Sequence, residues 1–441
     1  MKSKLKLGDF ILLLGTVAVF LLSIFLWIFI MVNDQYFSHV EQTSSVTEHS
    51  RSRIVYNLYI PTSSYSYQNG QLYRLYDAKK NLPIEFIREL KNTKYQGVEK
   101  ISTSPKKYEQ LLNNHDNLQL TFPNEVSMNL FTKTSPQKNE PKFRRVFVTA
   151  SDRYLYLGND RTYTIYRVNF TKADFSRLRK YARNAHGRSP VELVRLKDGY
   201  EVFYTKLGHW RVYSYLTNSQ TDSYFVSRLF GTSNVTSSSN KKGWTTYALN
   251  YYTKLRVPDA KSKHHNFLYS RYEKQKSEST SKRQLDSVEY VHKLGLSEQD
   301  LRYFDTVGNS VSYINYIEGI PVFLDSHNPQ VKATFLQDEV ELAFNNIDLQ
   351  IPIPFDGQMR TLPTSGEVMK KMLNVGLKRS EIQRVIVAYR VEQDNTRNNL
   401  INLVPIYYVK AYNQWKSVVE WAKQDPNALA KLHQAMAKEE K

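Results

Sequence analysis

Residues 10–32 read FILLLGTVAVFLLSIFLWIFIMV, and this stretch decides how the rest of the chain is laid out. It contains no charged residue, proline or amide side chain. At about 1.5 Å per residue, a helix of this length crosses a hydrocarbon core of roughly 30 Å. We therefore expect a transmembrane helix over residues 10–32. Residues 1–9 carry Lys2, Lys4 and Lys6, and the positive-inside bias keeps this basic N-terminus in the cytoplasm.

With this orientation of the helix, nearly all residues that follow it lie on the extracytoplasmic side of the membrane. Residues 33–52 form a polar juxtamembrane linker, and the region from residue 53 onward is extracytoplasmic. A cleaved signal peptide is the alternative, but its apolar region usually spans about 7–15 residues and ends at a small-x-small site. Residues 33–37 read NDQYF and offer no such site. We therefore predict a retained, single-pass anchor in the cell membrane.

One face of the predicted helix carries small side chains. The candidate interaction residues on this face are Gly15, Ala18, Leu22 and Ser23. Small residues let the backbones of two membrane helices approach closely, so we expect this face to contact partner helices. A lipid-facing anchor without a contact face is the alternative, because the run has no strict Gly-x-x-x-Gly pattern.

The composition narrows the class of protein. Cysteine is absent, which excludes a disulfide scaffold, thiol catalysis and cysteine-ligated metals. The formal net charge is +19 at pH 7, and most of it lies in the predicted extracytoplasmic region. A secreted eukaryotic ectodomain of this size would usually contain disulfides, whereas a bacterial cell-surface protein need not, so we expect a bacterial protein. Its basic surface attracts polyanions, and outside a bacterium these are anionic wall polymers and lipid headgroups rather than nucleic acid.

Hydrophobic periodicity and chain breaks predict an α+β fold of antiparallel sheets packed with helices, divided into several extracytoplasmic units. The predicted units are α+β domain 1 at residues 53–184, β-rich domain 2 at 185–280, α+β domain 3 at 281–425 and a charged helical tail at 426–441.

Local signals place individual elements within these units. Alternating residues at 53–60 predict a first strand, and one helix is expected to start at Pro83. A second helix has Ser104 as its N-cap and Pro105 in its first position, where proline is favoured. Asp198-Gly199 between two apolar runs predicts a β-hairpin.

The C-terminal third contains a faint internal repeat. Two predicted helices, residues 283–294 and 366–375, each end at a glycine and each lead into a pair of strands. The second strand of each pair carries a similar tetrad, IPVF at residues 320–323 and VPIY at 404–407. Because proline is tolerated at sheet edges, we predict two equivalent edges in a duplicated helix–strand–strand unit, with coincidence as the alternative.

The sequence contains few residues in patterns typical of catalytic or metal sites. His264 and His265 are adjacent, so their side chains diverge, and the sequence has no His-Glu-x-x-His, Gly-x-Ser-x-Gly or phosphate-loop pattern. The densest acidic cluster is Asp338, Glu339 and Glu341, but it alternates with apolar residues as the wet face of a strand does. We therefore predict no catalytic, cofactor-binding or metal-binding residues, no cofactor, and a protein that is not an enzyme.

Several local strings resemble one known family. They are LQLTFP at residues 118–123, FRRV at 143–146, the segment 223–231, GIPVF at 319–323 and SGEV at 365–368. Their order behind a basic N-terminus and a single membrane helix is similar to the YycH family, membrane-anchored accessory regulators of Gram-positive bacteria. The unit at 53–184 favours YycH over the shorter sister protein YycI.

The resemblance implies a non-enzymatic regulator of an essential two-component system. In that family, the membrane helix and the ectodomain interact with the sensor histidine kinase WalK, also called YycG, and with a YycI-type sister protein, and the kinase controls cell-wall metabolism. Both activation and inhibition occur in the family, so the sign stays open. The alternative function is an extracytoplasmic surface protein that binds anionic cell-wall polymer. A glycosidase acting through Asp338 and Glu341 is a third hypothesis.

Overall fold

A computed structural model describes thirteen stretches of the chain. They are residues 15–24, 54–77, 80–132, 140–241, 243–259, 265–274, 279–296, 300–325, 328–353, 358–394, 397, 399–425 and 427–432. Residues 15–24 and 427–432 are helical. No helix within these stretches has the length and apolar character needed to span a membrane. The remainder of the predicted anchor at 10–32, the N-terminus at 1–9 and the linker at 33–52 lie outside the described residues.

The first of two large sheets has nine strands. They are β1 Ser63–Gln68, β2 Gln71–Tyr76, β3 Lys94–Ser102, β4 Leu118–Ser127, β5 Lys142–Val148, β6 Tyr154–Asn159, β7 Thr164–Lys172, β8 Gly187–Leu196 and β9 Gly199–Tyr204. Their order is β3-β7-β6-β5-β4-β1-β2-β8-β9, with antiparallel neighbours throughout. The predicted hairpin is confirmed, because Leu196 pairs with Gly199 across the turn.

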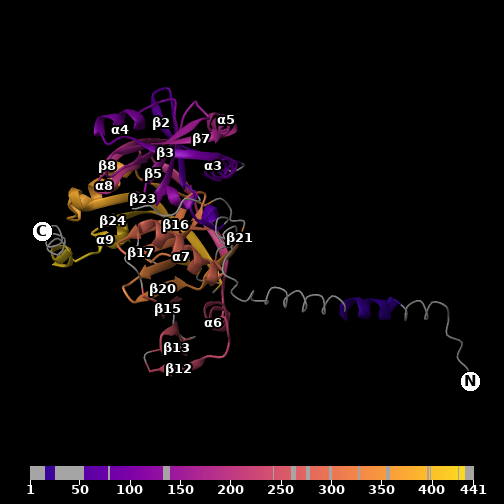
Figure 1. Ribbon diagram of the computed structural model, residues 1–441. Coiled ribbons are helices and arrows are strands. Elements are labelled where there is room, and N and C mark those ends of the chain that lie inside the picture. The colour runs from indigo at the N-terminus through magenta and orange to yellow at the C-terminus, as the bar shows by residue number, and fades with distance from the viewer. Residues whose placement is uncertain are drawn as a thin grey trace, which may run out of the picture.

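Helices cover both faces of this sheet, which lies at the top of Figure 1. They are α3 Leu82–Lys91, α4 Pro105–Leu112, α5 Ser176–Arg183 and the short 3-10 helix η1 Met128–Leu130. Along β5, Val146 and Val148 pack in the cluster that includes α3 and α5, whereas Phe147 packs with α4 on the other face. The predicted helices are confirmed: Pro83 lies in the first turn of α3, and α4 begins at Pro105.

The strand predicted at residues 53–60 is wrong. Residues 54–58 form a short helix instead. Val55, Leu58 and Tyr59 are all buried at three- and four-residue spacing, so the segment packs as the face of a helix rather than as an alternating strand. The Tyr59 hydroxyl lies 2.9 Å from the Tyr313 hydroxyl.

The second sheet has fourteen strands. They are β11 Tyr213–Ser219, β12 Thr236–Asn240, β13 Trp244–Asn250, β14 Thr253–Pro258, β15 Asn266–Tyr272, β16 Leu301–Val307, β17 Ser310–Ile317, β18 Ile320–Phe323, β19 Val331–Phe335, β20 Glu339–Asn345, β21 Ile347–Ile353, β23 Ile382–Gln393, β24 Leu400–Ala411 and β25 Gln414–Ser417. The order is β12-β13-β14-β15-β20-β19-β17-β18-β23-β24-β11-β21, with β16 beside β17 and β25 beside β24. Strands β10 Gly208–Arg211 and β22 Met359–Leu362 form a separate pair.

The four α-helices of this half have side-chain N-caps, whereas its 3-10 helix has none. These helices are α6 Asp222–Phe230, α7 Thr280–Leu294, α8 Ser365–Asn374, α9 Val418–Ala422 and the 3-10 helix η3 Arg379–Glu381. Helix α7 ends at Gly295 with φ 72°, a left-handed conformation that favours glycine. Helix α8 begins with a capping box between Thr364 and Glu367. The α+β fold class with mostly antiparallel sheets is therefore confirmed.

The tetrads at 320–323 and 404–407 do not lie at sheet edges, so that prediction is wrong. The first forms β18, a third strand after α7, and it pairs in parallel with β23; the second lies within β24 on the other side of β23. Each proline still sits where one neighbour is missing. Within the described pairings, Pro321 has a partner on β17 alone, and Pro405 falls between the segments of β24 that pair with β11 and β25. The proposed duplication stays a prediction.

The sheets cross the predicted domain limits. Strands β8 and β9 follow residue 184 but complete the first sheet, and the second sheet contains strands from both sides of residue 280. Sheet pairing alone does not divide a chain into domains. The units 53–184, 185–280 and 281–425 therefore remain predictions.

Candidate functional site

Buried charges gather where the two sheets meet. Strand β9 contacts β23, and β4 contacts β16. Between them lies a cavity of about 80 Å³. We call the buried charged side chains around this junction the charged seam; its members are Arg144, Arg145, Asp160, Glu201, Asp305, Arg384 and Lys410.

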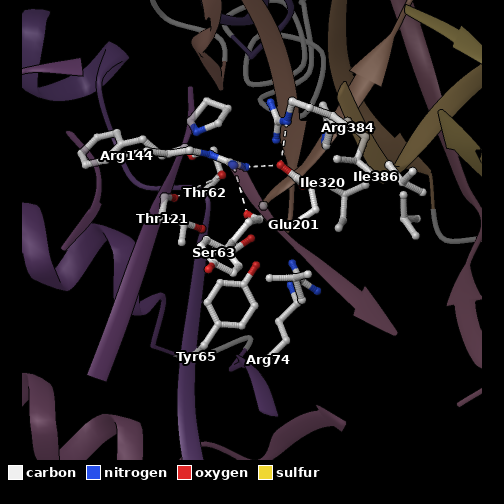
Figure 2. A pocket seen from close by; sticks show the side chains of 18 of the residues that line it. Thr62, Ser63, Tyr65, Arg74, Thr121, Arg144, Glu201, Ile320, Arg384 and Ile386 are labelled. Atoms are coloured by element: carbon white, nitrogen blue, oxygen red, sulfur yellow. Dashed lines mark hydrogen bonds and ion pairs between the residues drawn. The ribbon is translucent and has the colours of Figure 1, made fainter. Parts of the chain in front are cut away.

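Glu201 is one of the ions that link the two sheets. Its Oε1 accepts from Arg144 Nη2 on β5 and, at 2.9 Å, from Arg384 Nε on β23. Figure 2 shows the two arginines reaching Glu201 from different sides. Burial raises the pKa of the Glu201 carboxyl, but the charges of Arg144 and Arg384 more than offset this, and the net pKa is lowered. Glu201 is therefore ionised at neutral pH.

Asp160 anchors the two adjacent arginines of β5. Arg145 Nε donates to its Oδ1 at 2.8 Å, Arg144 Nη1 to its Oδ2 at 3.3 Å, and the Tyr108 hydroxyl to its Oδ1 at 2.6 Å. Burial raises the pKa of Asp160, whereas Arg145 and Arg144 lower it to below its usual range. Gly199 is required here, because a Cβ at that position would lie 2.5 Å from Asp160 Cβ.

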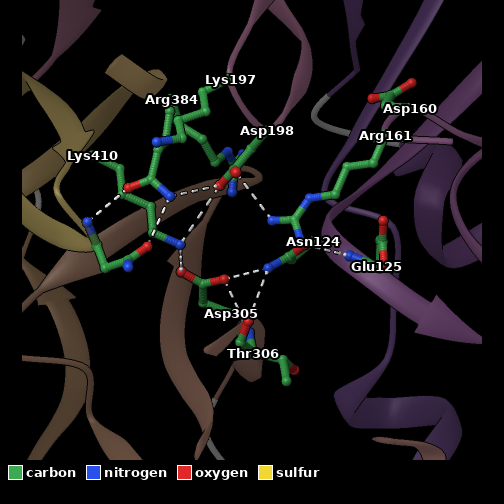
Figure 3. Close-up of polar contacts among 12 residues, drawn as sticks. Asn124, Glu125, Asp160, Arg161, Lys197, Asp198, Asp305, Thr306, Arg384 and Lys410 are labelled. Atoms are coloured by element: carbon green, nitrogen blue, oxygen red, sulfur yellow. Dashed lines mark hydrogen bonds and ion pairs between the residues drawn. The ribbon is translucent and has the colours of Figure 1, made fainter. Parts of the chain in front are cut away.

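A second centre of the seam surrounds Asp305 of β16. Lys410 Nζ on β24 donates to its Oδ2 at 2.7 Å, and Asn124 from the first sheet bonds its Oδ1. Figure 3 shows Asp305 between Lys410 and Asn124. Burial raises the pKa of Asp305, but Lys410 more than offsets it, so the net pKa is lowered. Lys410 also lies 3.9 Å from Asp198 in the β8–β9 turn, which ties the turn to the second sheet.

These contacts suit the seam to holding the sheets together. A carboxylate with a lowered pKa, paired to an arginine or lysine, does not donate a proton near neutral pH. Removing one partner of such a buried pair leaves the other charge without compensation. The arrangement therefore fixes how the first and second sheets are joined.

The predicted site residues lie elsewhere. Gly15, Ala18, Leu22 and Ser23 are all in the described helix at 15–24, and nothing in the structure tests their role as an interaction face. Glu341 alternates on β20 with buried Val340 and Leu342, as a strand face does.

The histidines of the described residues form no metal-binding cluster. His265 Nδ1 lies 3.2 Å from Asn346 Oδ1, and His264 lies outside the described residues. In the described part of the chain, no group of three or more histidines and acids is placed to hold a metal.

The charged seam was not predicted from the sequence. Its one local signal is the pair Arg144-Arg145 inside an otherwise apolar strand, since charged residues in a buried strand need partners. The partner carboxylates, Glu201 among them, lie on distant strands that periodicity does not connect.

A second, open site lies beside α5. A groove of about 730 Å³ is lined mainly by polar and basic side chains; its residues are Asp77, Lys80, Ser176, Arg177, Lys180, Tyr181, Arg183, Asn184 and His186. Lys80 Nζ lies 4.1 Å from the centroid of the Tyr181 ring. We call this the basic groove.

The fold and the seam define a class of protein: a mostly antiparallel α+β body of two sheets joined through buried ion pairs. A family model described as "YycH protein, C-terminal domain" matches residues 204–425, half of the chain. The chain belongs to the YycH family, which confirms the resemblance found in the sequence.

The structural comparison agrees with this membership. The crystal structure of YycH from Bacillus subtilis has a TM-score of 0.65 at 15% identity, covering 82% of this chain and 96% of that chain, and it supports the fold. An uncharacterized protein from Eubacterium rectale has a TM-score of 0.30 at 11% identity, covering 46% of this chain and 77% of that one. This score is too low to indicate a shared fold. No curated protein sequence matches the chain.

Membership of the family has general implications. It implies a part in regulating the WalK/YycG two-component system, association with a sensor kinase and YycI, and a membrane-associated extracytoplasmic location. The family consists of regulatory accessory proteins and is not known for enzymatic activity.

Proposed function

We propose that this protein is a non-enzymatic regulator of an essential two-component system of Gram-positive bacteria. It modulates a membrane sensor histidine kinase of the WalK/YycG type that controls cell-wall metabolism. The observation that carries the proposal is the family match over residues 204–425. Residues 10–32 anchor the protein in the cell membrane with residues 1–9 in the cytoplasm, and the apolar run with its preceding lysines supports this topology.

Regulation of this kind requires contacts that differ between the states of the kinase. A partner that binds two states equally shifts neither. We assign these contacts to the membrane helix, through Gly15, Ala18, Leu22 and Ser23, and to the ectodomain, which also meets a YycI-type protein. The ion-paired junction of the sheets supports this role, because a firmly joined body keeps its contact surfaces in a fixed arrangement.

Co-purification from membranes tests the helix contact. The full chain should recover the sensor kinase, and a Gly15→Leu/Ala18→Leu variant should recover less, because larger side chains keep the helices apart. A Val17→Leu/Phe20→Leu variant alters the opposite face of the same helix and serves as the matched control. Equal recovery with all three proteins would reject the helix contact, and absence of a kinase from every sample would reject the regulatory function.

Binding of anionic cell-wall polymer is the second candidate function, and the basic groove favours it. Lys80, Arg177, Lys180 and Arg183 line an open surface, where phosphate groups along a polymer can contact several cations at once. Sedimentation of the protein with purified cell wall, at low and at physiological salt, tests this function. Binding that does not weaken with salt would contradict it, because contacts between exposed charges are screened.

A further inference from the structure

The cavity between the sheets has more positive charge around it than its carboxylates balance. Four arginines and one glutamate are among its lining residues: Arg74, Arg144, Arg145, Arg384 and Glu201. All five are buried. The Asp160 carboxylate, which pairs with Arg144 and Arg145, and the exposed Glu318 carboxylate near Arg74 remove only part of the excess. A cluster of buried cations is costly unless anions or hydrogen-bond acceptors meet it.

Two of these arginines have a free donor. Arg144 uses all three of its nitrogens, on Glu201, Asp160 and backbone oxygens. In contrast, Nη1 of Arg145 and Nη1 of Arg384 are buried and have no acceptor among the described residues. Both side chains line the cavity and are more than nine-tenths buried, so an acceptor inside the cavity can meet these N–H groups. The other neighbour of the Arg384 guanidinium is the Trp415 ring, whose centroid lies 5.5 Å from Cζ.

The rest of the lining also supplies hydrogen-bond donors. Figure 2 shows Thr62, Ser63 and Tyr65 on one wall and Arg384 with Ile320 on the other. A volume of about 80 Å³ admits one small ion and is far below the several hundred Å³ of a typical organic ligand pocket. Water would accept from the free N–H groups but would leave the charge excess in place.

We propose that this cavity binds a single small oxyanion of the phosphate or sulfate type. The anion accepts from Nη1 of Arg145 and of Arg384, and it completes the charge balance of the seam at the junction of the two sheets. Because the cavity is small and its cationic walls are buried, the ligand is the free ion rather than a phosphate carried on a polymer or lipid.

Calorimetric titration of the full chain in detergent tests this proposal. The buffer contains sodium gluconate, whose anion is too large for the cavity, at constant ionic strength, and the probes are inorganic phosphate and sulfate. We expect saturable binding at one site, together with a rise in Tm that increases with probe concentration as expected for a ligand of the folded state. Phosphate or sulfate that stabilises the protein no more than gluconate would overturn the proposal.

Variants locate the site. Arg384→Gln should weaken the affinity about tenfold or more, because a charged hydrogen bond is lost. Arg390→Gln removes the same charge from the same strand, at a side chain that is 31% exposed and pairs with Glu392, and should leave the affinity unchanged. Ser63→Leu fills the cavity without removing a charged group, so it decides the question if Arg384→Gln does not fold. Unchanged affinity in Ser63→Leu would show that the anion binds outside the cavity and would overturn the proposal.

Discussion

Two clusters of basic side chains in this protein have opposite surroundings. In the charged seam, Arg144 and Arg384 are buried and share the carboxylate of Glu201. In the basic groove, Arg177 and Lys180 line an open surface. The net charge of +19 therefore does not describe one property of the molecule. The same residue types join the sheets in one place and are available to a polyanion in the other.

The cost of desolvation explains the difference. Burying an ion costs several kcal/mol of hydration free energy. An oppositely charged, hydrogen-bonded partner must offset this cost. An exposed ion keeps its hydration and gains about 0–1 kcal/mol from a partner. Substitutions in the seam should therefore change stability, whereas substitutions in the groove should change binding.

The largest effect is expected for Glu201→Gln. It leaves Arg144 and Arg384 without their shared charge, so the free energy of unfolding should fall by about 3–5 kcal/mol, as for other broken buried pairs. Urea unfolding at pH 7 measures this. Glu99→Gln is the control, because Glu99 pairs with Arg167 at the surface and should change stability by less than about 1 kcal/mol. Equal losses in both variants would remove the distinction between buried and exposed charges.

A smaller effect is expected for Tyr108→Phe. The buried Tyr108 hydroxyl donates to Asp160 at 2.6 Å, and losing a hydrogen bond to a charged group costs about 1.5–3 kcal/mol. The matched control is Tyr200→Phe, whose hydroxyl bonds Glu109 at the surface and should cost less. The same unfolding assay compares the two variants, and a Tyr200→Phe loss as large as that of Tyr108→Phe would contradict the expectation.

Acid should weaken the seam gradually. The pKa values of Asp160, Glu201 and Asp305 are lower in the folded protein than in the unfolded chain, so their stabilisation is complete above the unfolded pKa, near 4, and is lost as pH falls through the folded values. Between pH 7 and pH 4 the loss should be smaller than for Tyr108→Phe, because these carboxylates remain largely ionised.

Thermal unfolding at pH 7, 5, 4 and 3 follows this dependence. Glu201→Gln should show a shallower decline, since one of the three titrating groups is missing. A stability that increases as the pH falls from 4 to 3 would contradict the assignment of these carboxylates as ionised in the fold.

The smallest effect on stability is expected in the basic groove. Arg177→Gln/Lys180→Gln should change the free energy of unfolding by no more than about 0.5 kcal/mol, because such surface substitutions seldom do more. The same variant should bind anionic wall polymer less tightly at low salt and resemble the unaltered protein at high salt. A stability loss as large as that of Tyr108→Phe would show that the groove is part of the structural framework.

The features that the sequence predicted correctly are those that depend on neighbouring residues. Ser104 and Pro105 marked the start of α4, and Asp198-Gly199 marked a hairpin, because caps and tight turns depend on residues close together in the chain. The segment at 53–60 failed because its burial follows a helical spacing despite residues that favour strands. The prediction that the two tetrads lie at sheet edges was wrong. Whether a strand is an interior or an edge strand depends on partner strands that are distant in sequence.

The candidate site was harder to predict for the same reason. Arg144-Arg145 lies in an otherwise apolar strand, which signals buried charges, but nothing in the local sequence connects Glu201 or Arg384 to this pair. Their role exists only once β5, β9 and β23 come together, which no local periodicity encodes.

The short helix at 54–58 lies where a pulling force on the N-terminal side of the chain would reach the folded region. Tyr59, directly after it, stacks on Tyr303 at 4.9 Å between ring centroids and donates to the Gln284 carbonyl of α7 at 3.2 Å, which fastens it to the second half of the molecule. Three residues on, the Thr62 N–H donates to the Thr121 carbonyl of β4 at 2.8 Å, in the first sheet. A pulling force applied at residue 54 is therefore transmitted to both sheets at once. It acts across the junction that the ion pairs of Glu201 help to stabilise.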